Sequence, residues 1–123
     1  MGDNTRILTV DDSASMRALL RHALTSLGFD VAQADDGVAA LEWLDVNDCD
    51  VIITDINMPR LDGFGLIERL RQDDRHRDHP ILVLSTESSD EKKARARSAG
   101  ATGWIVKPFD AQKLAAAVRR VAH

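Results

Sequence analysis

Short apolar runs alternate with longer segments of helical periodicity along the whole chain. Five of the runs have the length of β-strands, and they span residues 7–10, 30–34, 51–55, 81–85 and 104–106. Most are nearly continuous in apolar residues and rich in Val and Ile. Continuous rather than alternating apolar character is typical of parallel strands that are covered on both faces. We therefore expect a buried parallel sheet.

The segments between the runs predict helices. The clearest begins after Asp12 or Ser13, either of which can cap it, and ends at Gly28. Its apolar residues fall at helical spacing: Met16, Leu19, Leu20, Ala23, Leu24 and Leu27. The last segment carries a second stripe, formed by Leu114, Ala115, Val118 and Val121. Shorter helices fit residues 38–44, 63–71 and 90–99.

Five successive β/α pairs predict an α/β fold with an open, doubly wound sheet, because crossovers between parallel strands are right-handed. A flavodoxin-like strand order of 2-1-3-4-5 is the simplest layout for five such units. The helix over residues 90–99 offers only Ala94, Ala96 and Ala99 as apolar contacts. It should bury little surface, so we expect it to be mobile; an ordinary solvated surface helix is the alternative.

Acidic residues follow the strands whose carboxyl ends form the expected ligand site of this fold. Asp11 and Asp12 come directly after the first strand, Asp55 closes the third, and Lys107 follows the fifth. Three carboxylates and one lysine leave a charge of −3 + 1 = −2, which favours a bound cation. Hard oxygen ligands without His or Cys favour Mg²⁺.

A metal held by few protein ligands has room for phosphate oxygens. Phosphoryl transfer to Asp55 is therefore chemically reasonable, with Mg²⁺ and Lys107 neutralising the equatorial oxygens. Each residue also has a structural interpretation. Asp11 or Asp12 alone could cap a helix, and a lysine before Pro108 could belong to an ordinary turn. Their expected convergence on Asp55 favours the site.

Composition narrows the class of protein further. A chain of 123 residues with 44% hydrophobic content, no repeat and no linker suits one domain, over residues 1–123. The net charge of −4 argues against binding to nucleic acid or to an anionic membrane as the main activity. Residues 1–6 carry no apolar signal core, and no run approaches membrane-spanning length, so we expect a cytoplasmic protein.

The cysteine and histidine residues indicate neither a disulfide nor a zinc site. The lone Cys49 excludes an intramolecular disulfide. The histidines show no zinc-ligand spacing, and we expect none of them to bind metal: His22, His76, His79 and His123.

Four motifs, each at its own strand end, resemble those of bacterial response-regulator receiver domains. They are Val-Asp-Asp-Ser at 10–13, Thr-Asp-Ile-Asn-Met-Pro at 54–59 with Asp-Gly at 62–63, Ser-Thr-Glu at 85–87, and Gly-Trp-Ile-Val-Lys-Pro-Phe at 103–109. The resemblance covers essentially the whole chain and is greatest to single-domain chemotaxis regulators of the CheY type. Such regulators catalyse only their own phosphorylation and dephosphorylation.

The resemblance assigns metal and acceptor roles. It implies that Asp55 is the phosphoacceptor, that Asp12 and Asp55 bind Mg²⁺ directly, and that Asp11 acts largely through water. Asn57 would contribute its backbone carbonyl to the metal.

It also implies partners for the phosphoryl group. Lys107 would bond a phosphoryl oxygen, aimed inward by a cis peptide bond to Pro108 that only an X-Pro sequence adopts cheaply. Ser85 would hydrogen-bond the group after modification; a serine at the edge of the core is the alternative. Asn57 and Glu87 would flank the path of the hydrolytic water, which predicts a short-lived signal unless both are merely solvated.

The switch residues depart from the best-known chemotaxis regulators, which carry Tyr where this chain has Trp104. Trp104 lacks the hydroxyl, and its bulk beside the β-branched Thr86 restricts inward rotation. Trp104 either reorients on activation or stays on the surface as an anchor for a partner.

Only residues 122 and 123 follow the last helix, so we expect no output domain and an output through protein binding by a monomer. The fourth helix, fifth strand and fifth helix should form a basic surface that fits an acidic partner, or else a solvated face: Lys92, Lys93, Arg95, Arg97, Lys113, Arg119 and Arg120. The resemblance implies a chemotaxis-type histidine kinase as phosphodonor, and a flagellar motor switch protein and a phosphatase as further partners.

Other functions fit the pattern less well. A flavin-binding protein could hold a phosphate at Ser13 and Ser15, but Asp11 and Asp12 would repel it. A Mg²⁺ phosphohydrolase would need a second general acid two residues after Asp55 and a cap domain. Within the regulators, a phosphorelay shuttle, a phosphate sink or a developmental regulator is the alternative to motor control.

Overall fold

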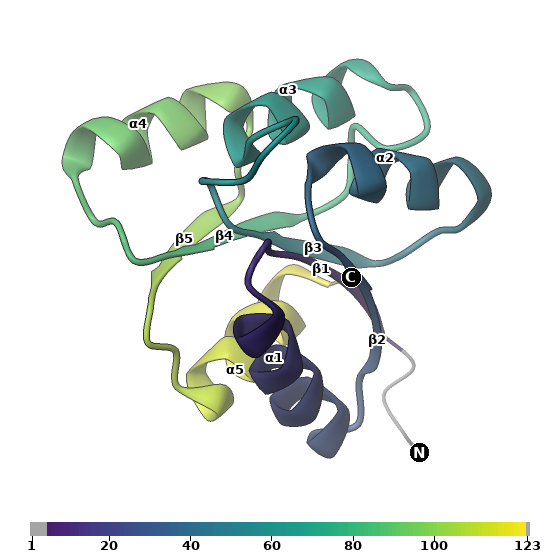
Figure 1. Cartoon of the computed structure of the whole chain (residues 1–123), viewed down its shortest axis with the longest axis vertical. Helices are drawn as coiled ribbons and strands as arrows, with labels where there is room; N and C mark the ends of the chain where they lie inside the picture. The colour runs from purple at the N-terminus through teal and green to yellow at the C-terminus, as the bar shows by residue number, and fades with distance from the viewer. Residues whose placement is uncertain (1–4, 123) are drawn as a thin grey trace.

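The computed structural model describes residues 5–122 of the chain, in which five strands alternate with five helices (Figure 1). The strands are β1 (Arg6–Val10), β2 (Asp30–Ala34), β3 (Val51–Thr54), β4 (Ile81–Ser85) and β5 (Gly103–Val106). The helices are α1 (Ala14–Ser26), α2 (Gly37–Val46), α3 (Gly63–Gln72), α4 (Asp90–Ala99) and α5 (Ala111–Val121). Residues 1–4 and His123, for which the sequence predicts neither a signal core nor a zinc ligand, lie outside this range.

The strands form one parallel sheet in the order β2-β1-β3-β4-β5, which confirms the predicted topology. Helices α2, α3 and α4 cover one face of the sheet, and α1 and α5 cover the other (Figure 1). The strand order reverses between β1 and β3, so their carboxyl ends border the crevice in which such folds bind ligands.

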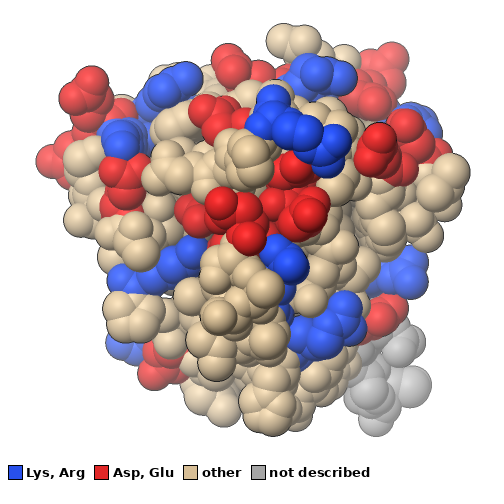
Figure 2. Space-filling model, viewed as in Figure 1, with Lys and Arg blue, Asp and Glu red and all other residues tan. Residues whose placement is uncertain are grey.

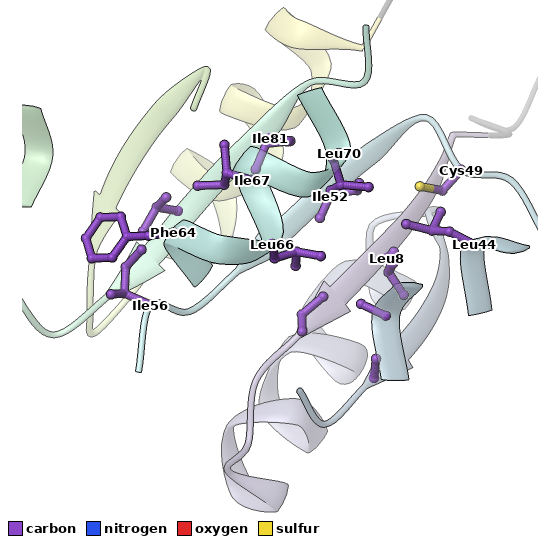
Figure 3. Packing of buried hydrophobic residues seen from close by; sticks show 14 of the residues in the cluster. Leu8, Leu44, Cys49, Ile52, Ile56, Phe64, Leu66, Ile67, Leu70 and Ile81 are labelled. Carbon is purple, nitrogen blue, oxygen red and sulfur yellow. The ribbon is translucent and has the colours of Figure 1, made fainter. Parts of the chain in front are cut away.

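Two apolar clusters fill the spaces between the sheet and its helices. One joins α2, α3 and α4 to the sheet and includes Leu8, Ile52, Leu66 and Leu70 (Figure 3). The other joins α1 and α5 to the opposite face. At about 25 cal/mol per Å² of apolar surface, burial on both faces supplies most of the driving force for folding.

Helix α1 differs from the prediction on one side of its stripe. Ser13 rather than Asp12 is the N-cap, and its Oγ accepts a hydrogen bond from the amide of Met16 at 3.2 Å. Leu20 and Leu24 are buried, but Leu19 is 57% exposed, contrary to the prediction that it packs inward. Because α5 shares this face of the sheet, only a narrow stripe of α1 reaches the core.

Helix α4 buries a single residue, Ala96, while Ala94 is exposed. Capping residues at both ends of α4 stabilise the helix, although it packs little apolar surface. Ser89 caps its N-terminus, and Gly100 ends it in the left-handed conformation at φ 117°. Its mobility stays a prediction, supported by this shallow packing.

Candidate functional site

The carboxyl ends of β1, β3 and β5 bring three carboxylates and one ammonium group together. Asp11 and Asp12 follow β1, Asp55 follows β3, and Lys107 follows β5. One carboxylate oxygen from each of the three acids lies within 4.8 Å of the other two. Lys107 Nζ donates to Asp11 Oδ2 at 2.8 Å and to Asp55 Oδ2 at 3.2 Å. A cation therefore already bridges two of the three acids.

These four groups differ in their access to solvent. The side chains of Asp11 and Lys107 are 2% and 9% exposed, that of Asp55 is 13% exposed, and Asp12 lies on the surface. Burial by itself lowers the pKa of Lys107, but the hydrogen bond to Asp11 and the negative charge of Asp55 outweigh it, and the net shift is upward. Acidic side chains gather near the centre of the face seen in Figure 2, with basic groups beside them.

Backbone contacts fix Asp55 where β3 ends. Its amide donates to the carbonyl of Val10 at 2.9 Å, and its Oδ1 accepts from the amide of Ile56 at 2.7 Å. The first residue of α3, Gly63, packs so closely on the Asp55 carbonyl that a Cβ there would collide with it. The Asp-Gly pair at 62–63 therefore serves the site: Asp62 caps α3, and Gly63 allows the helix to start against the acceptor.

Asp11 is held from two sides. Its Oδ1 accepts from the amide of Ser13 at 2.9 Å, and its carbonyl oxygen accepts from Arg17 Nη1 at 2.7 Å. The contact from Arg17 was not predicted, because a single arginine in the first turns of a helix gives no signal in a sequence.

An ion pair that the sequence does not predict holds the loop between β3 and α3 in place. Arg60 donates from Nε to Asp36 Oδ2 at 2.6 Å and from Nη2 to Asp36 Oδ1 at 2.9 Å. The hydrogen bond from Arg60 lowers the pKa of Asp36, whose side chain is almost completely buried. Asp36 also caps α2, and this capping role is the only part of the arrangement that a sequence could indicate.

The donor set fits a hard divalent cation. Three carboxylates converge without an imidazole or a thiol among them, and Asp12 and Asp55 remain open to solvent. Mg²⁺ prefers such oxygens and keeps several waters. The acids leave a formal charge of −2 after Lys107 is counted, which a divalent ion would neutralise.

The remaining phosphoryl-binding candidates lie on β4 and after β5. Ser85 is fully buried at the end of β4, where its Oγ accepts from the amide of Glu87 at 3.2 Å. The carbonyl of Ser85 accepts from the amide of Lys107 at 2.8 Å, which joins the ends of β4 and β5. The peptide bond between Lys107 and Pro108 is cis, as the resemblance implied.

Asn57 and Glu87 contact each other directly. Asn57 Nδ2 donates to Glu87 Oε2 at 3.1 Å, and Lys92 Nζ forms a short ion pair with Glu87 Oε1. The hydrogen bond from Lys92, followed by that from Asn57, lowers the pKa of Glu87. Lys92 was predicted to face a partner, whereas here it ties α4 to the loop after β4.

Trp104 is half-buried rather than free on the surface. Its Nε1 donates to the carbonyl of Glu87 at 2.9 Å, and its ring packs against the cluster beneath α4. Trp104 has no phenolic hydroxyl, and its polar contact comes from the indole N–H instead. The neighbouring predicted switch residue, Thr86, is exposed. Trp104 also lines a hollow of about 250 Å³ together with Lys93 and Arg97 of α4.

The predicted basic surface is only partly continuous. Lys93, Arg97 and Lys113 lie on α4 and α5 as expected. Arg95 instead stacks over the ring of Phe64 at 4.1 Å, and Arg119 lies over Phe29 at 5.1 Å. Phe29 belongs to the apolar cluster under α1 and α5, so Arg119 lies on a different side from the α4 residues. Cation–π contact accounts for both departures.

A doubly wound sheet with an acidic cluster and a bridging lysine at its switch point has the arrangement that suits a cation or a phosphoryl group. Residues 7–119 match the family model of the response regulator receiver domain, and the chain belongs to that family. The resemblance inferred from the four motifs is confirmed.

Similar proteins include chemotaxis regulators. The chain is 42% identical over 111 residues to the chemotaxis protein CheY1 of Helicobacter pylori, covering 89% of this chain and 90% of that one. The structure of the chemotaxis response regulator CheY4 of Vibrio cholerae superposes with a TM-score of 0.90 at 41% identity, covering 97% and 99% of the two chains.

A second similar structure contains a metal. The receiver domain of the sensor histidine kinase PA1611 of Pseudomonas aeruginosa has a TM-score of 0.90 at 26% identity and covers 98% of each chain. It has a magnesium ion coordinated in its active-site cleft.

In this chain, no helix within residues 5–122 is long and apolar enough to cross a bilayer.

Proposed function

We propose that Asp55 accepts a phosphoryl group from a chemotaxis-type histidine kinase, and that the modified protein signals by binding another protein. The observation that carries the proposal is the position of Lys107 Nζ, within hydrogen-bond distance of Asp55 and of the buried Asp11. A lysine placed there can bond a phosphoryl oxygen on Asp55 without a change of backbone. The chemotaxis relatives support the same activity.

Asp11, Asp12 and Asp55, with the backbone carbonyl of Asn57, would hold Mg²⁺. When bound, Mg²⁺ neutralises negative charge on the transferring phosphoryl group. The three convergent carboxylates support this site, and so does the magnesium ion in the similar receiver domain of PA1611.

The transfer itself needs little from the protein beyond position. A carboxylate oxygen of Asp55 forms a bond to phosphorus while the bond from phosphorus to the kinase imidazole breaks, and the nitrogen keeps the electron pair. The amide of Ile56, at 2.7 Å from Asp55 Oδ1, orients the carboxylate for in-line attack. Lys107 then exchanges its bond to Asp55 for one to a phosphoryl oxygen.

Loss of the phosphoryl group would involve the pair formed by Asn57 and Glu87. Their side chains meet between the end of β3 and the start of α4, and we expect the attacking water to reach Asp55 beside them. Polar side chains at this position can orient the water, which supports a short-lived signal.

The signal would pass to α4 through Ser85. Ser85 Oγ now accepts from the amide of Glu87, and Trp104 Nε1 donates to the carbonyl of the same residue. If Ser85 turned toward the phosphoryl group, the first bond would break and the anchor of Trp104 would shift with the loop. The partner would be an acidic surface of the flagellar motor switch, meeting Lys93, Arg97 and Lys113.

Transfer from a labelled kinase tests the proposal. A chemotaxis-type histidine kinase from the same organism is autophosphorylated with radiolabelled ATP, freed of nucleotide, and mixed with the chain in Mg²⁺. We expect the label to move to the wild-type chain and to Asp74→Asn. Asp74 is the control because its carboxylate is exposed in the turn between α3 and β4 and is not part of the acidic cluster. Label on Asp55→Asn, or none on the wild type, would contradict the assignment.

A further inference from the structure

A cluster of metal-ligand side chains lies at the opposite edge of the sheet from Asp55. Asp48 precedes β3, while His76 and His79 precede β4, so all three lie near the amino ends of neighbouring strands. Figure 1 shows the two connections, α2 to β3 and α3 to β4, on the same side of the molecule. One ligand atom of each residue lies within 4.8 Å of the other two.

Two of the three distances between these atoms match those between ligands of one tetrahedral ion. His76 Nδ1 lies 3.1 Å from His79 Nε2, and His79 Nε2 lies 3.2 Å from Asp48 Oδ1. Zinc binds imidazole nitrogen and carboxylate oxygen at about 2.0–2.2 Å, which places neighbouring tetrahedral ligands about 3.3 Å apart. The side chain of Asp48 is 82% exposed, so it can close on an ion by rotation alone.

Hydrogen bonds satisfy these three atoms poorly. If His79 Nε2 carries a proton, Asp48 Oδ1 and His76 Nδ1 must share it; if His79 Nε2 instead accepts from His76, it faces Asp48 lone pair to lone pair. Within residues 5–122, His76 Nε2 is the buried side-chain nitrogen or oxygen that lacks a hydrogen-bond partner, so the 5%-exposed ring is held through Nδ1.

The surroundings admit an ion. A hollow of about 570 Å³ lined by Asp45, Asp48 and His76 gives access from solvent. The nearby positive charge of Arg71 is directed at backbone carbonyls, including that of His79.

We propose that Asp48 Oδ1, His76 Nδ1 and His79 Nε2 form a second metal site, for a borderline transition-metal ion of the Zn²⁺ type with water in its fourth position. Two imidazoles and one carboxylate favour such an ion over Mg²⁺, which prefers oxygen. Its ligands come from the α2–β3 and α3–β4 loops, which the ion pair of Arg75 with Asp45 at the end of α2 already links, so the ion would add a second clamp between them. The site is independent of phosphorylation at Asp55.

The spacing of the histidines in the sequence predicts no metal ligand among them, and the fold explains the difference. The spacing of His76 and His79 places them on one side of a helical turn, in which the amide of His79 donates to the carbonyl of His76 at 3.1 Å. The third ligand comes from a residue 28 positions before His76, and only the fold brings it close.

Calorimetric titration with Zn²⁺ tests the site on the full chain, prepared without a histidine tag and stripped with EDTA. Excess Mg²⁺ keeps the acidic cluster occupied. We expect one Zn²⁺ per chain, with affinity about a hundredfold lower in His79→Ala and about tenfold lower in Asp48→Asn. The exposed His22→Ala is the matched control and should bind as the wild type does.

Co²⁺ gives a second readout, because tetrahedral Co²⁺ absorbs visible light strongly and octahedral Co²⁺ does not. The wild type and His22→Ala should show the tetrahedral spectrum, and His79→Ala should lose it. Since His76 is almost fully buried and its replacement can unfold the chain, the exposed Asp48 and the less buried His79 carry the test. Absence of Zn²⁺ binding would overturn the proposal, as would binding that survives in His79→Ala and is lost in Asp12→Asn.

Discussion

Replacing Lys107 by Met removes the positive charge between two carboxylates and keeps an unbranched side chain in its place. In the wild type, Lys107 Nζ contacts Asp11 at 2.8 Å and Asp55 at 3.2 Å. The variant leaves Asp11, with a 2%-exposed side chain, without its cationic partner and close to two other acids. In the absence of divalent cations, the variant should therefore be less stable than the wild type.

The magnitude follows from burial. Breaking a buried ion pair by removing one partner costs about 3–5 kcal/mol. The opening of the site to solvent at Asp55 and Asp12 reduces this, so we expect a loss of about 3 kcal/mol in the free energy of unfolding. With a urea m-value of about 1.5 kcal/mol/M, the midpoint of unfolding should fall by about 2 M.

Urea unfolding followed by circular dichroism, in EDTA and again in Mg²⁺, measures the effect. Mg²⁺ should stabilise the variant more than the wild type, because the ion replaces the missing positive charge. Lys113→Met, on the exposed face of α5, is the control and should unfold within about 0.5 kcal/mol of the wild type.

The pH dependence has a definite sign. The folded-state pKa of Lys107 lies above its ordinary value of 10.5. The contribution of the pair is therefore complete below pH 10.5 and disappears as the pH rises through the folded-state pKa. The difference between wild type and variant should be constant at neutral pH and shrink in strong alkali. Equal stability of the two proteins in EDTA would refute the reasoning.

Three further predictions concern the surroundings of the acceptor. Asp36→Ala removes both a helix cap and the partner of Arg60, and should lower the free energy of unfolding by about 1–3 kcal/mol. The pKa of Asp36 is lowered in the folded state, so its contribution to stability is complete above the unfolded-state pKa and is lost as the pH falls through the folded-state pKa, which unfolding curves in acid will check. Gly63→Ala forces a Cβ into the carbonyl of the acceptor aspartate and should cost about 1–3 kcal/mol in a thermal melt, while unchanged stability would contradict the close approach. Asn57→Ala and Glu87→Ala should each alter the rate of dephosphorylation, and the double variant should fall short of the sum; additive effects would show that their hydrogen bond has no part in it.

Sequence patterns predicted the fold because its central strands, β1, β3 and β4, are buried on both faces, and burial leaves continuous apolar runs. The acidic cluster was predictable for a related reason. Parallel strands place their carboxyl ends at one edge, so acids that follow β1 and β3 must meet there. Both inferences depend on periodicity and topology alone.

The missing contacts depend on side-chain direction across distant loops. Arg60 lies in the left-handed region at φ 67°, which is uncommon for arginine, and it donates to Asp36 from this conformation. Lys92 turns to Glu87 and Arg95 to Phe64, so a run of basic residues that suggested one continuous surface divides between different neighbours. Leu19 is exposed because α5 shares the face of the sheet that α1 covers.

Intact mass after treatment with acetyl phosphate tests the central claim most directly. The chain is incubated with acetyl phosphate and Mg²⁺, quenched in acid and weighed by mass spectrometry, beside Asp55→Asn, a sample in EDTA, and Asp74→Asn as a control. We predict one phosphoryl adduct on the wild type and on Asp74→Asn, and none on Asp55→Asn or in EDTA. An unmodified wild type that is folded by circular dichroism, or an adduct that persists in Asp55→Asn, would contradict the account.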